Sequence, residues 1–409
     1  MNAAVGAQQP FHGLKVMDLA WVVAGPLIGR TLAEFGATVV RIESRKRVET
    51  ARLMGPFPGG QADPQRSVLF DNCNVNKLGL TLDLTQESAR QVALDLACWA
   101  DVVIESFMPG QMAKFGLAYD RLRALNPRVI MVSTSLLGQT GPYAQFSGYG
   151  NIGAALAGYQ MLVGRENELP VGPFGPYTDF VAPRFAIVAL LAALDHRERT
   201  GEGAFIDVSQ AEAGVAFLAP QVAHYALSGR SAVACGNRDP QCAPHGVYRC
   251  RGTDAWVAIV ARDDDEWRRL ALHVGGNRLA ADPRFADLEA RKRHEDALDE
   301  CIAAWTATRT AAAVERELQS LPVPAHVVAN SVEFCADPQL LARGHFVRLE
   351  RDGLGESVVE ASRYSLSATP AQLTRSAPTF GRDTTRVLKE LLGYDDARIA
   401  ALSQAGALT

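Results

Sequence analysis

Apolar and polar positions along the first half of the chain fall into blocks that predict a repeated order of strand, helix and strand. Residues 14–20 and 38–44 are mostly apolar and predict buried strands, and residues 26–36 between them have helical spacing. A helix that joins two neighbouring strands is the connection that a parallel sheet requires. The pattern continues with a helix at 88–100 and with strands at 78–85, 101–107, 125–138 and 204–208.

The most strongly helical stretch is 183–201, where Pro183 fits the first turn and basic residues fill the last turn. Ser209 and Glu212 have the spacing of a capping box, which predicts the start of another helix. Residues 138–180 are rich in Gly, Pro and Tyr, and we expect them to form a long loop.

The second half of the chain predicts a different organisation. A hairpin is expected at 246–261, and charged helical patterns follow as far as residue 319. The sequence therefore indicates an α/β protein, in which a smaller α+β domain is inserted into a larger domain with a parallel sheet. We expect the large domain to begin with 1–225, the small domain with its linkers to occupy 226–322, and 323–409 to return to the large domain.

Composition narrows the expected partners and compartment. The 409 residues include 41 Lys and Arg and 45 Asp and Glu, so the net charge is −4. Such mild acidity predicts no nucleic-acid partner and no anionic membrane partner. The first residues lack a signal-peptide pattern, and the longest apolar run, 185–194, is too short to span a bilayer, so we expect a cytoplasmic protein. Seven cysteines without a CxxC pair, and histidines without ligand spacing, predict no metal site.

Asp179 is the first candidate for chemistry. It follows a stretch rich in Gly and Pro and precedes the predicted helix at 183, so the helix dipole would stabilise its anionic form. One interpretation is an ordinary helix cap, and the other is a carboxylate nucleophile in a glycine-lined cleft. Basic residues also lie near the ends of strands, where open α/β sheets bind phosphate-bearing ligands. They would allow a polyanionic ligand such as a nucleotide, and they are Arg41, Lys77, Lys114 and Arg128.

Several stretches in order along the chain resemble one family, the family III CoA-transferases, which includes formyl-CoA and carnitine CoA-transferases. The most telling stretch is 177–213, YTDFVAPRFAIVALLAALDHRERTGEGAFIDVSQAEA. The others are GLKVMDLAWVVAGPLIGRTLAEFGATVVRIES (13–44), NVNKLGLTLDL (74–84), DVVIESFMPGQMAKFGL (101–117), LNPRVIMVSTSLLGQTGPY (125–143) and APTFGRDTTRVLKELLGY (377–394).

The resemblance implies a role for individual residues. Asp179 falls at the position of the catalytic aspartate, and Val22 and Val23 fall in the loop that faces the acyl-CoA. Four residues fall at or beside positions that bind the adenine, ribose and phosphates of CoA, and these are Arg41, Asn76, Lys77 and Lys114. CoA would be a substrate, with no tightly bound cofactor.

The resemblance also implies an assembly and a substrate class. Family members form interlaced dimers of ring-like chains, each with a large Rossmann-like domain and a small domain. Residues 236–267 are similar to the branch that holds the subunits of succinyl-CoA:(R)-benzylsuccinate CoA-transferase. This implies succinyl-CoA as donor and (R)-benzylsuccinate or another apolar or aromatic acid as acceptor. The partner chain would be a second copy or a homologous subunit.

Two departures from the family pattern leave other functions open. Met108 stands where a basic residue is usual, so one contact with a CoA phosphate that the resemblance implies is not expected here. No Gly-Gly-Gly loop is found, which argues against formate and oxalate as substrates. A non-catalytic partner subunit is the main alternative. An acyl-CoA racemase is less favoured, because the stretch 148–151 lacks the histidine base that proton transfer would need.

Overall fold

The computed structural model describes residues 8–409, which form two compact units. The large unit comprises residues 8–160, 172–232 and 342–409, and the small unit comprises 161–171 and 233–341. The expected small domain at 226–322 overlaps the second unit over most of its length. The domain limits given above remain a prediction.

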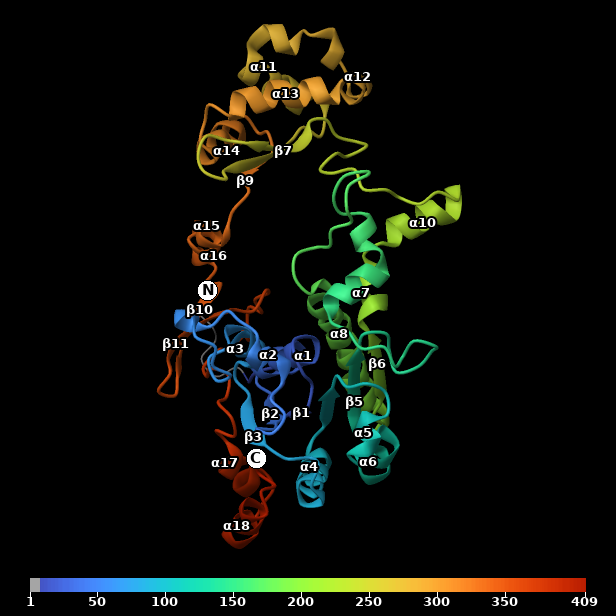
Figure 1. Ribbon diagram of the computed structural model, residues 1–409, viewed down its shortest axis with the longest axis vertical. Coiled ribbons are helices and arrows are strands. Elements are labelled where there is room, and N and C mark those ends of the chain that lie inside the picture. Colours follow the sequence, from blue (N-terminus) through green and yellow to red (C-terminus); the bar gives the residue numbers. More distant parts are fainter. Residues whose placement is uncertain (1–7) are drawn as a thin grey trace. The chain divides into compact units, whose positions relative to one another are not determined.

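A six-stranded parallel sheet forms the centre of the large unit, with the order β3-β2-β1-β4-β5-β6 (Figure 1). This is the doubly wound order, in which the chain runs outward from β1 in one direction and then restarts with β4 on its other side. The parallel α/β sheet expected from the sequence is confirmed. The strands are Lys15–Asp18 (β1), Thr38–Glu43 (β2), Leu78–Thr81 (β3), Val102–Glu105 (β4), Ile130–Ser135 (β5) and Phe205–Ser209 (β6).

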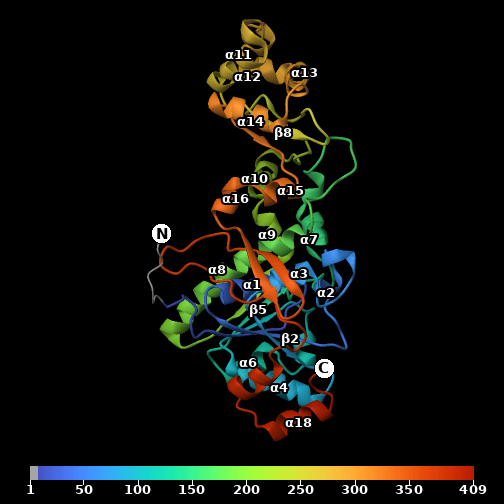
Figure 2. The same ribbon diagram turned by 90° about the vertical axis from the view of Figure 1, so that its left-hand side faces the viewer.

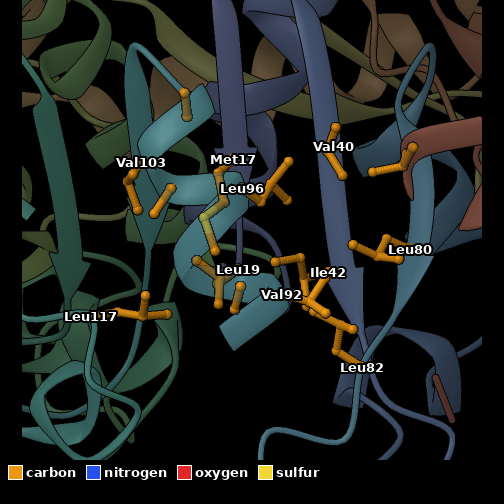
Figure 3. Close-up of a cluster of buried hydrophobic side chains, with 14 of the residues drawn as sticks. Met17, Leu19, Val40, Ile42, Leu80, Leu82, Val92, Leu96, Val103 and Leu117 are labelled. Carbon is orange, nitrogen blue, oxygen red and sulfur yellow. The ribbon is translucent and has the colours of Figure 1, made fainter. Parts of the chain in front are cut away.

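Each face of the sheet buries its apolar side chains under a helical layer. Figure 3 shows one face, where Val92 and Leu96 of α4 (Glu87–Trp99) lie against side chains of four strands, among them Met17, Val40 and Leu80. On the other face α1 (Ala24–Glu34) and α8 (Tyr177–Thr200) share a core with the sheet. Burial on both faces explains why the strands are continuous apolar runs rather than alternating ones.

Helix α8 begins six residues earlier than predicted. Its first residue is Tyr177, so Asp179 lies in the first turn and Pro183 lies inside the helix. Pro183 has no N–H to donate to the carbonyl of Asp179 four residues before it. The helix tolerates this loss near its start, where few backbone bonds have formed. Ser209 caps α9 (Gln210–Ala216) by accepting a bond from the Glu212 amide, as predicted.

Within the described residues, α8 is the one helix long and apolar enough to cross a membrane by length and composition, with a mean hydropathy of 1.5. It is longer than the uninterrupted apolar run at 185–194 because the helix includes residues on both sides of that run. Ala182, Ala186 and Leu190 are fully buried in the core it shares with the sheet, as expected of a core helix.

Several elements of the large unit were missed by the sequence analysis. The expected loop at 138–180 contains α7 (Gly150–Ala157), a helix built largely from Gly and Ala. Residues 50–74 contain α2 (Thr50–Leu53), η1 (Pro58–Gly60) and α3 (Val68–Asn74). The remaining ones are α5 (Gln111–Lys114), α6 (Tyr119–Leu125), η2 (Tyr159–Met161), α10 (Ala219–Ser228) and the antiparallel pair β10 (Phe346–Arg351) and β11 (Gly355–Glu360).

The end of the chain returns to the open edge of the sheet beside β3. The Asp383 carboxylate accepts a bond from the Gly79 amide, and the Thr81 hydroxyl donates to the carbonyl of Leu408. Figure 2 shows α18 (Asp396–Gln404) beside α4, where Arg398 pairs with Asp95. Residues 372–409, with α17 (Thr384–Arg386) and η4 (Val387–Leu391), thus cover this edge strand.

The small unit has its own core around a three-stranded antiparallel sheet. The predicted hairpin is confirmed as β7 (His245–Arg249) and β8 (Trp256–Val260), and β9 (Ala325–Val327) pairs with β8. Buried aromatic residues pack its helices on this sheet. These helices are α11 (Asp264–Ala280), η3 (Pro283–Phe285), α12 (Leu288–Arg293), α13 (Glu295–Thr306) and α14 (Ala311–Ser320), and α15 (Ser331–Cys335) and α16 (Pro338–Ala342) follow them.

A buried network of charges lies at the carboxyl end of β1. Lys77 Nζ donates to Asp18 Oδ2 at 2.7 Å, and Arg41 Nη1 lies 3.4 Å from Asp18 Oδ1. Arg41 Nη2 also pairs with Glu49 at 2.7 Å, and Glu49 accepts a bond from the amide of Val22. All four charged side chains are almost completely buried. The network ties β1, β2 and the approach to β3 to the loop at 19–23.

We expect Lys77→Met to lower the free energy of unfolding by about 3–5 kcal/mol, because it leaves the buried Asp18 carboxylate short of one counter-charge. Thermal or guanidinium unfolding measures the change. Arg199→Met is the matched control, since Arg199 forms an exposed pair with Asp195 and its loss costs less than about 1 kcal/mol. Equal effects of the two substitutions would contradict this assignment.

Candidate active site

The crevice at the centre of the sheet lies where the strand order reverses, between the carboxyl ends of β1 and β4. Open α/β sheets bind their ligands at such a switch point. Two loops border it, 19–23 after β1 and 106–110 after β4. The Trp21 amide donates to Ser106 Oγ at 2.8 Å and joins the two loops.

A buried glutamate holds each loop by a backbone amide. Glu49 accepts from Val22, and Glu105 accepts from Phe107, both bonds being 2.7–2.8 Å long. Val22 has a φ of 66°, a left-handed conformation that is strained for a β-branched residue. Burial raises the pKa of Glu105 to about 7, although its bonds from Ser133 and Phe107 oppose the rise. The crevice therefore has a fixed border.

The first cavity at this crevice, which we call the Asp179 cavity, has a volume of about 320 Å³. It lies over the carboxyl ends of β1, β4 and β5, and the start of α8 closes it. Its lining combines apolar and aromatic side chains with hydroxyl groups, and the charged residues among them are Arg47 and Asp179. The lining residues are Trp21, Val22, Ala24, Arg47, Thr50, Ser106, Phe107, Met108, Pro109, Thr134, Ser135, Leu136, Ala144, Phe146, Ser147, Gly148, Tyr149, Asp179 and Gln210.

Asp179 is held where the first turns of α7, α8 and α9 meet. The Gly150 amide donates to Asp179 Oδ2 at 2.8 Å. Thr178, the neighbour of Asp179 on α8, donates to the Gly150 carbonyl and to Gln210 Oε1, both at 3.2 Å. The carboxylate is only 3% exposed, yet it borders the cavity.

Glycines permit this close meeting of helices. A Cβ at Gly150 would lie 2.6 Å from the Pro176 carbonyl oxygen and 2.7 Å from the Asp179 amide nitrogen. A Cβ at Gly153 would lie 2.3 Å from Thr178 Oγ1. The glycine content that predicted a loop at 138–180 is therefore what lets α7 approach α8.

Burial raises the pKa of Asp179 to about 6, and the bonds from Gly150 and Gln210 oppose the rise. The carboxylate is thus mostly ionised near neutral pH, and it is incompletely solvated in that form. A desolvated carboxylate is a better nucleophile than a hydrated one, and it needs no general base to act.

A second cavity adjoins the first, and we call it the sheet-edge cavity. Its volume is about 520 Å³, and it lies beyond the ends of β1, β2, β3 and β4. Four residues line both cavities, namely Trp21, Arg47, Phe107 and Met108. The others in the sheet-edge cavity are Leu19, Ile42, Glu43, Ser44, Lys46, Asp83, Leu84, Thr85, Gln111 and Phe115.

The structure brings Asp179 and Val22 together in the Asp179 cavity but distributes the other predicted site residues elsewhere. Val23 is fully buried in a small core with Leu27 and Cys73. Lys114 is exposed on α5, next to Phe115 of the sheet-edge cavity.

The remaining three predicted CoA contacts make internal bonds. Arg41 and Lys77 are fully buried in the network around Asp18. The Asn76 side chain donates to the Gln372 carbonyl and accepts from the amides of Thr374 and Arg375, so it anchors the C-terminal segment. For all three, CoA binding remains a prediction.

Sequence reasoning missed Arg47, Lys46 and Gln210. The basic run at 45–47 was a visible signal, because it comes directly after the predicted strand at 38–44. Gln210 had a weaker signal, since the cap at Ser209 located its helix but not its neighbours. Among residues 8–409, no group of three His, Cys, Asp or Glu side chains is arranged to hold a metal ion.

Comparisons with known proteins agree with this geometry. A family model described as CoA-transferase family III matches residues 11–384. Succinyl-CoA–D-citramalate CoA-transferase of Chloroflexus aurantiacus is 32% identical over 404 residues, covering 96% of this chain and 97% of the relative. The α subunit of succinyl-CoA–L-malate CoA-transferase from the same species is 33% identical over 396 residues, covering 97% and 92%. A crystal structure of a CaiB/BaiF family protein from Brucella suis has a TM-score of 0.86 at 30% identity, covering 94% of this chain and all of that one. The chain belongs to family III of the CoA-transferases.

Proposed function

We propose that this chain moves CoA from succinyl-CoA to a carboxylic acid, with Asp179 as the nucleophile. The observation that carries the proposal is a nearly buried carboxylate, held by the Gly150 amide, at the border of a cavity at the sheet's switch point. The relatives reported above are named as succinyl-CoA transferases, which supports the donor.

The first half of the proposed reaction removes CoA from the donor. Asp179 attacks the thioester carbonyl, a C–O bond forms, the C–S bond breaks, and CoA leaves as thiolate. The thiolate then attacks the Asp179 carbonyl carbon of the resulting anhydride. This step releases the donor acid as a carboxylate and leaves CoA as a thioester on Asp179. No proton is transferred, so no general base is required.

The second half repeats these steps in reverse with the acceptor. Its carboxylate attacks the aspartyl thioester and expels the thiolate, and the thiolate attacks the acceptor carbonyl of the new anhydride. Acyl-CoA leaves and the Asp179 carboxylate is regenerated. Water would hydrolyse either intermediate, so the apolar and aromatic side chains of the cavity are proposed to limit its access.

We place the nucleotide end of CoA in the sheet-edge cavity and its thioester in the Asp179 cavity. The cavities share four lining residues, which gives one path for a long substrate. Lys46 supplies positive charge for phosphates, and Trp21, Phe107 and Phe115 supply aromatic faces for the adenine. Met108, which stands where the family has a basic residue, lines the same cavity.

The acceptor is proposed as an acid with an apolar or aromatic part, such as (R)-benzylsuccinate. Phe146 and Tyr149 on the loop 143–149, with Leu136 at the end of β5, give the Asp179 cavity an apolar wall. A non-catalytic partner subunit is the second candidate function, because homologous CoA-transferases with α and β subunits exist among the relatives. The built surroundings of Asp179 favour the catalytic role.

A second chain is proposed to cover the apolar surface of α8 and α10. No residue of α10 is buried, and its Tyr225 and Leu227 are 62% and 91% exposed. On α8, Val188 is 67% exposed and Leu191 is 46% exposed. Apolar exposure on this scale is typical of an interface. The covering chain would be a second copy or a homologous subunit, in the interlaced arrangement that the family resemblance implies.

Incubation with succinyl-CoA is expected to add CoA to the protein, and peptide mapping by mass spectrometry should locate it on Asp179. Asp179→Asn should remove the adduct without lowering stability. Its folded pKa of about 6 exceeds the unfolded value, so ionisation of Asp179 costs about 3 kcal/mol above pH 6, and this cost is absent below pH 3.8. We therefore expect Asp179→Asn to unfold at a higher temperature at pH 8.

An unmodified protein that still binds CoA would favour the partner-subunit function. An adduct on another residue, retained in Asp179→Asn, would refute the nucleophile. Either result is read from the same mass spectra.

Activity is expected to fall as the pH drops through about 6, because protonation removes the nucleophile. Gln210→Ala removes a bond to the carboxylate that lowers its pKa, so the acid limb of kcat/KM should move to higher pH. Ser228→Ala is the control, since Ser228 bonds only within α10 and its neighbouring turn, and its profile should equal that of the parent. An unmoved limb in Gln210→Ala would show that Gln210 does not act on Asp179.

Light scattering after gel filtration is expected to give a multiple of the 44.0 kDa chain mass. Leu227→Asp combined with Val188→Asp should weaken the assembly about tenfold or more, because two charges would enter an apolar contact. Leu169→Asp, at an exposed loop position, should leave the mass unchanged. A monomeric parent protein at micromolar concentration, with no homologous subunit present, would point to the heteromer.

A further inference from the structure

Arg47 is the one cation among the residues that line the Asp179 cavity. The other polar side-chain groups of the lining are hydroxyls, the Trp21 indole N–H, the Gln210 amide and the Asp179 carboxylate. Arg47 is exposed, and no carboxylate among the described residues forms an ion pair with it. Its guanidinium lies 5.2 Å from the centre of the Trp21 ring, which also borders the cavity. The cation is therefore positioned by an aromatic face and free to bind an anion.

Other basic side chains nearby are already paired. Arg52 is buried against Glu43, and Lys46 donates to Asp83 in the sheet-edge cavity. Arg41 and Lys77 are held in the network at Asp18. An anionic group that enters the Asp179 cavity beside the reacting carbonyl thus has Arg47 as its available counter-charge.

We propose that Arg47 selects dicarboxylic acids by binding the carboxylate that does not react. This inference rests on the proposed transferase function and names its substrate class. Donor and acceptor acyl groups must occupy the same cavity in turn, because both react at Asp179. One cation therefore serves both partners, and each carries a second carboxylate. A guanidinium suits this role because it binds a carboxylate by two parallel bonds.

The apolar lining is compatible with this class, since it contacts the carbon chain between the two carboxylates. Trp21, Phe107 and Leu136 provide such surface. An acid with one carboxylate would form no ion pair with Arg47, whereas a dicarboxylate would form one, so the dicarboxylate is expected to bind more tightly.

The test compares glutarate with pentanoate, which has a methyl group where glutarate has its second carboxylate. In a double-displacement reaction the kcat/KM of an acceptor does not depend on the donor, so its ratio for the two acids isolates the acyl group. The parent protein should prefer glutarate, and Arg47→Met should lower the ratio about tenfold to hundredfold. Arg47→Lys should keep part of the preference, because it keeps the charge.

Lys46→Met separates this role from CoA binding. Lys46 lines only the sheet-edge cavity, so its loss should weaken the binding of acyl-CoA and leave the glutarate-to-pentanoate ratio of kcat/KM unchanged. If Arg47→Met lowered kcat/KM for both acids by the same factor, the ratio would not change. Arg47 would then act on CoA rather than on the second carboxylate, and the inference would be wrong. A parent protein without preference for glutarate would overturn it too.

Calorimetry keeps the inference testable if turnover itself fails. Glutarate is titrated into the Asp179→Asn protein saturated with CoA. The same titration is repeated with the double variant that carries both Asp179→Asn and Arg47→Met. Binding that Arg47→Met abolishes supports the role of Arg47 even when no acid is converted. Glutarate binding that is equal with and without Arg47, or equal to that of pentanoate, refutes it. Absence of a CoA adduct in the parent protein would instead refute the nucleophile.

Discussion

The site depends on the neutralisation of charge at the end of β1. Asp18 receives Lys77 on one oxygen and Arg41 on the other, and Arg41 passes the link to Glu49. Such buried ions are costly to desolvate, so the arrangement is stable only when every partner is present. The effect of this charge network is to hold the loop at 19–23 in place, including the left-handed conformation of Val22, which is unfavourable for a β-branched residue. The border of both cavities is therefore set by buried ions that do not themselves line either cavity.

Asp179, the proposed nucleophile, has the opposite arrangement, because no cation among residues 8–409 forms an ion pair with its carboxylate. Asp179 is held by the Gly150 amide and the Gln210 side chain, which are neutral, so burial raises its pKa to about 6. A salt bridge would lower the pKa but would also reduce its reactivity. The large unit thus contains buried charge in two arrangements, one paired, which fixes a loop, and one unpaired, which we propose to be the reacting group. This difference favours the proposed catalytic role of Asp179 over that of an ordinary helix cap.

The sequence predicted the sheet well because strands buried on both faces are continuous apolar runs. The prediction was wrong in the segment rich in small residues, where a loop was expected and α7 is found. Gly150 and Gly153 indicated a loop by composition, whereas in the structure they allow α7 to contact Thr178 on α8. Pro183 predicted a helix start, because a proline inside a helix is unfavourable. In the structure the helix begins at Tyr177, and the turn before Pro183 has no sequence pattern that predicts it. Gln210 lies at the site only through tertiary packing, which no local pattern encodes, whereas the basic run at 45–47 gave a local signal for Arg47.

The covering of β3 by residues 372–409 has a consequence for synthesis on the ribosome. The strand that the last residues protect is made from residues 78–81, so hundreds of residues must follow before its edge is closed. An open edge strand can pair with other chains during that interval. In the sequence, the residues of the small unit come between these two segments. The small unit has its own core and can fold before the large unit is complete. The edges of β1 and β2 are covered by strands that are synthesised soon after them, whereas the outer edge of β3 is covered only by residues 372–409. The edge of β3 therefore stays exposed longer than those of β1 and β2 during synthesis, and contacts between such distant segments also form slowly.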